Sequence, residues 1–137
     1  MVVSTLAAWP EKLSADLIIR ATCRWSRAQC RGLTCIPLLH RLFTPLGLTM
    51  IAPSFASLLT MFEAAAGRPI EIGARDRPSQ DQLAICAILT TANAPAVPFL
   101  PDMLEPSHPL SSTIDCAVAS IRLLVHLSAI PFEPIAL

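Results

Sequence analysis

The chain has 137 residues, of which 53% are hydrophobic and only 15% are charged, and its ten basic and ten acidic residues give a formal net charge of zero. This balance argues against a strongly basic nucleic-acid-binding protein, and the length corresponds to one ordinary domain that builds its core without disulfides. Because an average soluble domain is about 25% charged, we expect an apolar surface patch used for self-association, a partner, a ligand or a membrane.

The charged residues are unevenly distributed along the chain. Residues 1–50 contain six basic and two acidic residues, whereas residues 51–137 contain four basic and eight acidic ones. The two halves are therefore able to attract each other through opposite charge. The five cysteines are an odd number, which predicts reduced thiols packed as small apolar residues in a cytoplasmic protein. The first residues lack the basic segment of a secretory signal, which agrees with that location.

The first predicted helix spans Glu11–Arg31. Pro10 lies at its first turn and Gly32 stops it, because proline favours a first turn and glycine a helix end. An apolar face at helical spacing is expected to pack on the helix at 79–92. That face consists of Leu13, Leu17, Ile18, Ala21, Trp25 and Ala28. Beside it runs an arginine stripe with spacings i, i+4, i+7 and i+11, formed by Arg20, Arg24, Arg27 and Arg31.

This arginine stripe is the most suggestive polar feature of the sequence. Guanidinium groups bind oxyanions through paired hydrogen bonds, so the stripe is a candidate surface for an acidic or phosphorylated protein partner. Charge runs on helices also serve solubility, and the alternative is a solvated face whose arginines pair with the acidic second half of the chain. The sequence leaves both interpretations open.

Two further helices are predicted between residues 33 and 66. A short helix is expected over Pro37–Phe43, and a longer one over Ser54–Ala66, with Ser54 as its N-cap and Gly67 at its end. The longer helix has a buried stripe at helical spacing, made of Phe55, Leu58, Leu59 and Phe62. The residues that follow, Arg68–Pro78, carry several charges and predict an exposed connection.

Leu42–Phe62 is an uncharged run of 21 residues, which raises the question of a membrane role. A membrane-spanning helix needs about 20 apolar residues, so the run is long enough. Pro45, Gly47 and Pro53 interrupt it near its middle, however, and its second half has the pattern of an amphipathic helix. Membrane association is therefore kept as an alternative and is not favoured.

The stretch Ser79–Ala92 predicts a buried central helix. Its start is marked by a Ser-x-x-Gln capping box, in which Ser79 is the N-cap and Gln82 the reciprocal partner. A helix that is apolar all round is a core helix or a membrane helix, and about fourteen residues are too few to span a bilayer. The apolar residues that point in every direction are Leu83, Ile85, Cys86, Ile88 and Leu89.

The residues after this helix, about 93–110, contain five prolines and predict a Pro-rich arm without regular structure. The arm and the central helix together offer a candidate apolar pocket, lined by Phe99, Leu100 and Met103. A last helix is expected over Ser112–Ala129, with a capping box from Ser112 to Asp115. The predicted fold is an all-α, single-domain bundle of four main helices and one short helix around the helix at about 79–92.

Two groups of cysteine and histidine residues are close in sequence, and neither forms a recognisable site. Cys30, Cys35 and His40 surround the turn after the first helix, but the close cysteine pairs typical of zinc sites are absent, so no metal is assigned. Cys116 and His126 are ten residues apart on one predicted helix, about 15 Å along its axis, which is beyond hydrogen-bond reach. No catalytic or cofactor motif is found, and neither an enzymatic activity nor a cofactor is assigned.

The function expected from these features is that of a small regulatory or adaptor protein that acts through helix-mediated protein contacts. Self-association as a homodimer is the simplest use of the high apolar content. A small-molecule-binding helical domain, with the candidate apolar pocket as its site, is the alternative, and a membrane-associated protein is the second alternative.

Overall fold

The computed structural model describes residues 13–48, 50–74, 76–90 and 109–129, and the fold is described for these residues. They form five α-helices and one 3₁₀ helix, and their extended part contributes only an isolated antiparallel bridge between Ala74 and Arg77. The elements are α2 (Ala15–Arg31), α3 (Cys35–Phe43), η1 (Thr44–Leu46), α4 (Ile51–Ala66), α5 (Gln80–Thr90) and α6 (Pro109–Ala129). The predicted all-α class, with four main helices and one short helix, is confirmed.

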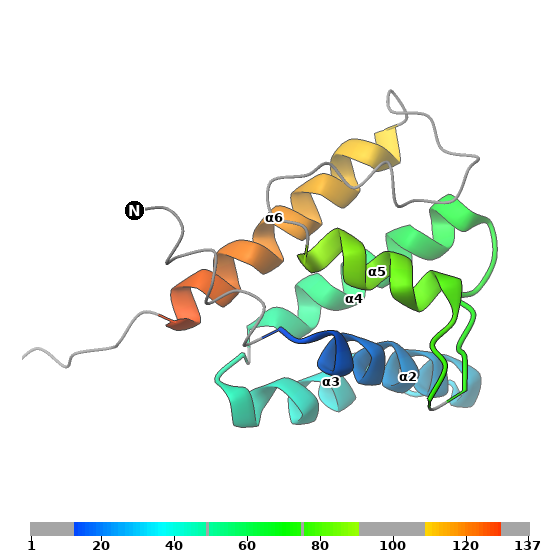
Figure 1. Ribbon diagram of the computed structural model, residues 1–137, viewed down its shortest axis with the longest axis horizontal. Helices are drawn as coiled ribbons and strands as arrows, with labels where there is room; N and C mark the ends of the chain where they lie inside the picture. Colours follow the sequence, from blue (N-terminus) through cyan, green and yellow to red (C-terminus); the bar gives the residue numbers. More distant parts are fainter. Residues whose placement is uncertain (1–12, 49, 75, 91–108, 130–137) are drawn as a thin grey trace, which may run out of the picture.

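The helices pack in a closed ring. α2 lies against α3 and α5, α3 lies against α4, and α6 completes the ring by contacting both α4 and α5. In Figure 1, α6 runs along one side of the molecule, α2 and α3 lie on the opposite side, and α4 and α5 lie between them. The contact predicted between the first helix and the helix at 79–92 is present as the packing of α2 on α5.

One hydrophobic core fills this ring. The predicted apolar face of the first helix is at most 3% exposed, and the predicted stripe of α4 is at most 1% exposed. Phe43 of α3 meets Phe55 of α4 with ring centroids 5.5 Å apart, an aromatic contact that joins the two helices. The last helix turns one face inward, on which Ile114, Val118, Ile121 and Val125 are buried and Ala117 and Leu124 are half-buried.

The helix at 79–92 is less enclosed than its composition predicts. Four of its apolar residues are buried in α5, but Leu83 is 47% exposed. α5 packs against α2 and α6, and this packing leaves about half of the Leu83 side chain exposed. Burial on every side is therefore wrong for this helix, which shares the middle of the molecule with α4 (Figure 1).

Three helices begin earlier than predicted, and the reason is proline in each case. α3 begins at Cys35 and α4 at Ile51, so that Pro37 and Pro53 each occupy the third helical position. α6 begins with Pro109 itself, which removes this residue from the predicted Pro-rich arm. The first N–H groups of a helix have no acceptor within it, so proline is tolerated there. The predicted N-cap at Ser54 and the predicted capping box at Ser112 are wrong, because both residues lie inside helices.

The first helix begins later than predicted. Residues 13 and 14 are not helical, and Ser14 is the N-cap of α2, accepting a hydrogen bond from the Leu17 N–H at 3.2 Å. Pro10 and Glu11 lie outside the described residues. The predicted helix ends are confirmed: Gly32 and Gly67 follow α2 and α4 with φ of 65° and 69°, the left-handed conformation that glycine adopts most readily.

The uncharged run Leu42–Phe62 does not form one helix. It contains the end of α3, the η1 turn, a left-handed Gly47 and most of α4. Among the described helices, none combines the length and the apolar character needed to cross a membrane.

Candidate functional site

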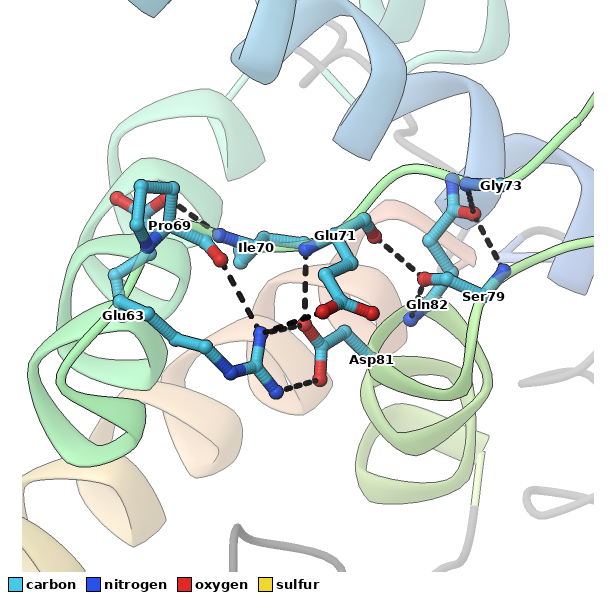
Figure 2. A network of polar contacts seen from close by, with 9 residues as sticks. Glu63, Pro69, Ile70, Glu71, Gly73, Ser79, Asp81 and Gln82 are labelled. Atoms are coloured by element: carbon cyan, nitrogen blue, oxygen red, sulfur yellow. Dashed lines mark hydrogen bonds and ion pairs between the residues drawn. The ribbon is translucent and has the colours of Figure 1, made fainter.

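A polar network anchors the connection between α4 and α5 (Figure 2). The predicted capping box is confirmed, because the Gln82 backbone N–H donates to Ser79 Oγ at 3.1 Å and the Ser79 N–H donates to Gln82 Oε1 at 2.9 Å. Gln82 Oε1 also accepts from the Gly73 N–H at 2.9 Å. One side chain, only 1% exposed, therefore holds the connection at two points.

The amide nitrogen of Gln82 extends the network to α2. Gln82 Nε2 donates to Thr22 Oγ1 at 2.9 Å, in a buried contact, and lies 3.6 Å from Cys23 Sγ. The Thr22 hydroxyl in turn donates to the Ile19 carbonyl. Gln82 thus links three segments, α5, the connection and α2, and fixes the distance between the last two.

Asp81 secures the other end of the connection. Its carboxylate accepts two hydrogen bonds from the Arg68 guanidinium, at 2.5 and 3.0 Å, and a third from the Glu71 backbone N–H at 2.8 Å. The Asp81 side chain is 8% exposed, and the hydrogen bonds from Arg68 hold the pKa of its carboxyl below its usual range. Asp81 lies in the first turn of α5 and forms an ion pair with Arg68 of the connection.

The backbone of the connection is consequently held in place by hydrogen bonds. Ile70 is 5% exposed and its N–H donates to Glu63 Oε2 at 2.9 Å. At the tip, the Arg77 N–H donates to the Ala74 carbonyl at 3.0 Å and closes a turn. The prediction of an exposed connection over Arg68–Pro78 is right for most of its described residues, of which only Ile70 is buried. The sequence did not predict that the backbone of this connection is bonded to acidic and amide side chains of α4 and α5.

The connection and α2 together line an open groove of about 740 Å³. We call it the cationic groove, and its lining residues are Arg20, Cys23, Arg24, Ser26, Arg27, Ile72 and Gly73. Three of the seven lining residues are arginines and none is acidic. The groove is therefore suited to an anionic group, which guanidinium forks bind through paired hydrogen bonds.

The structure separates the members of the arginine stripe. Arg20, Arg24 and Arg27 line the cationic groove, whereas Arg31 is exposed at the end of α2 and outside it. Arg20 has a partner, Asp16 of the same helix, at 3.7 Å. Within the described part of the chain, neither Arg24 nor Arg27 has an ion pair or a side-chain hydrogen bond. The expected pairing of the stripe with the acidic second half is not seen there.

Two lining residues could not be assigned from the sequence. Ile72 and Gly73 lie some fifty residues from the stripe and contribute no charged or reactive group of their own. The sequence feature closest to this groove wall is the Ser-x-x-Gln capping box, which predicts that Gln82 bonds to Ser79 at the helix start. It does not predict that the Gln82 side chain also reaches Gly73 and Thr22.

Two other candidate sites of the sequence are the apolar pocket and a metal site. The candidate apolar pocket of Phe99, Leu100 and Met103 lies outside the described residues. Within ranges 13–48, 50–74, 76–90 and 109–129, no group of three or more His, Cys, Asp or Glu side chains is placed to hold a metal ion.

The five cysteines are free thiols with different surroundings. Cys86 is buried, and burial raises the pKa of its thiol to about 11. Cys23 and Cys35 are half-buried, whereas Cys30 and Cys116 are exposed. The expectation that the thiols pack as small apolar residues is thus right for Cys86 and wrong for the two exposed cysteines.

Comparisons of the chain with protein-family models, curated proteins and solved structures find no match.

Proposed function

We propose that this chain is a small cytoplasmic regulatory or adaptor protein that binds an acidic or phosphorylated segment of a partner protein in the cationic groove. The observation that carries the proposal is the concentration of three arginines in one groove without an acidic lining residue. Arg24 and Arg27 are neighbours on α2 and have no ion pair among the described residues, so their charges repel each other, and an anionic ligand removes that repulsion.

Arg24 and Arg27, which have no partner among the described residues, support this proposal most strongly. Arg24 is half-buried and Arg27 is exposed, and both are held on a regular helix whose ends are capped. A ligand therefore meets side chains on a rigid backbone, which limits the entropy lost on binding. The surrounding connection is fixed by Gln82 and Asp81, so the opposite wall of the groove is rigid as well.

Reversing both charges is expected to abolish binding of an acidic peptide. A hydrogen bond to a charged group contributes about 1.5–3 kcal/mol, so loss of two such contacts weakens binding by about 100-fold or more in Arg24→Glu/Arg27→Glu. The measurement is fluorescence anisotropy with two labelled probes, a Glu-rich peptide and a phosphoserine peptide, each titrated at low and at physiological salt.

The matched control is Arg31→Glu/Arg41→Glu, which changes the net charge equally at two exposed positions outside the groove. This control should retain peptide affinity within a few-fold, and circular dichroism should show unchanged helix content for both variants. Equal loss of affinity in the two double variants would attribute binding to overall charge and discard the groove.

A second candidate function, self-association, is favoured by the outer face of α6. Cys116, Ser120, Leu123 and Leu127 share one stripe at helical spacing, and all four are exposed. Leu123 and Leu127 are 57% and 51% exposed, and the stripe carries no formal charge. An antiparallel two-fold contact sets each leucine against the small residues of the other copy, so a second copy of this chain is the occupant that we propose.

Leu123→Glu is expected to convert a dimer into a monomer, because the glutamate would place a charge in the contact. Light scattering after size exclusion, with reductant and without detergent, measures the mass of each species. Leu46→Glu is the matched control, since Leu46 is 48% exposed on η1 and not on α6. A wild-type monomer at high protein concentration would rule out the dimer.

A further inference from the structure

Arg24 and Arg27, neither of which has a partner in the described part of the chain, are close enough to hold one anionic group. Arg24 and Arg27 are three residues apart on α2, so their Cβ atoms are separated by about 5–6 Å. Both line the cationic groove, and Arg20 lines it one turn before Arg24. Since Asp16 partly neutralises Arg20, the uncompensated charge of the groove is concentrated at Arg24 and Arg27.

Two adjacent guanidinium forks match a phosphate group better than a carboxylate. A phosphomonoester carries a charge of about −1.5 to −2 at neutral pH and presents three strong acceptor oxygens. A carboxylate carries a single charge and two oxygens, so it satisfies one fork and leaves the second without a full partner. Two neighbouring cations on one helix, unpaired within the described ranges, therefore indicate a dianionic ligand.

The opposite wall of the groove indicates what surrounds the phosphate. Ile72 is 36% exposed beside the arginines and offers an apolar contact. The backbone N–H groups of Glu71 and Gly73 already donate to Asp81 and Gln82, so these two do not supply hydrogen bonds to an anion. Recognition thus depends on the guanidinium groups for the phosphate and on Ile72 for a neighbouring apolar side chain.

We infer that the cationic groove binds a phosphorylated segment of a partner protein, with the phosphate held between Arg24 and Arg27 and an adjacent apolar residue on Ile72. This inference rests on the proposed function and selects the phosphorylated partner over the merely acidic one.

The test uses the full chain and three labelled peptides that are identical except for a central Ser, Glu or phosphoserine, each followed by Leu. The phosphoserine peptide should bind at least tenfold tighter than the Glu peptide, and the Ser peptide should bind weakest. The variant Arg24→Lys/Arg27→Lys keeps both charges but loses both forks, and should weaken phosphopeptide binding at least tenfold. Arg27→Lys alone, at an exposed position, provides a second variant that preserves folding.

The outcomes separate the inference from the proposed function. Equal affinity for the Glu and phosphoserine peptides overturns the inference and leaves an acidic-segment binder. Lack of binding by all three peptides overturns both. If inorganic phosphate binds as tightly as the phosphopeptide, the source is a free phosphate and the peptide assignment fails. If Ile72→Ser weakens the binding of the phosphopeptide but not that of inorganic phosphate, the neighbouring apolar contact is supported. Equal affinities of wild type and Ile72→Ser for the phosphopeptide overturn this contact.

Discussion

Gln82→Ala is expected to lower the free energy of unfolding by about 3 kcal/mol. The substitution removes the acceptor of the Gly73 and Ser79 N–H groups, each at 2.9 Å, and the donor to the buried Thr22 hydroxyl. Each buried polar group that loses its hydrogen-bond partner costs about 1–3 kcal/mol, and three such groups are affected. Water can reach the two part-buried N–H groups, so the total cost lies near the lower end of the summed range. The effect is large because one side chain joins three segments of the chain.

Urea denaturation followed by far-ultraviolet circular dichroism measures this loss. Gln80→Ala is the matched control, because Gln80 is exposed in the first turn of the same helix and alanine favours helix. The control should change stability by less than about 0.5 kcal/mol. The same Gln82 variant should bind peptide less well, since Gly73 is a wall of the cationic groove. Similar stability of the two variants would contradict the role assigned to Gln82.

Gly73→Ala is expected to destabilise the protein by about 3 kcal/mol, the upper part of the usual range for overpacking. A Cβ atom at this position would meet the Arg77 carbonyl oxygen, and would lie 2.6 Å from Ser79 N and 2.8 Å from Pro78 C. All three are backbone atoms of the folded-back connection, so none can rotate away as a flexible side chain does. Relief requires opening the turn that the Arg77 N–H closes on Ala74.

Gly67→Ala distinguishes this steric cost from a conformational one. Gly67 has a φ of 69° and no atom within 4 Å of the position of an added Cβ. Its substitution should cost only about 1–2 kcal/mol, the strain of the left-handed conformation. Thermal and urea unfolding of both variants should therefore rank Gly73→Ala as the more damaging. The reverse order would show that the connection moves aside easily and is not a rigid wall of the groove.

The positions of the helices could be predicted because helix formation depends on residues that are close in sequence. Apolar residues at spacings of three and four mark a buried face, as they do for Leu17, Ala21 and Trp25 in α2. The capping box at Ser79 and Gln82 is equally local and was also predicted correctly. The helix starts near Pro37, Pro53 and Pro109 differ from the prediction, because proline is tolerated throughout the first turn and does not mark which residue begins the helix.

The exposure of Leu83 could not be predicted from its own segment. α5 is apolar all round, and which side is covered depends on the packing of α2 and α6, not on the helix itself. The exposed leucines of α6 follow the same rule, since the helix is apolar on more faces than its neighbours can cover. Composition predicted an apolar surface, and only the packing assigned it to particular residues.

The sequence by itself determined the all-α class, the buried faces of α2 and α4 and the order of the arginines along α2, because each follows from the helical period. Only the tertiary structure decided that Ile72 and Gly73 face those arginines across a groove. The physical reason is that this contact depends on side chains far apart in sequence, Gln82 on Thr22 and Arg68 on Asp81. Such contacts form only after the chain has folded back, and no local pattern specifies their partners.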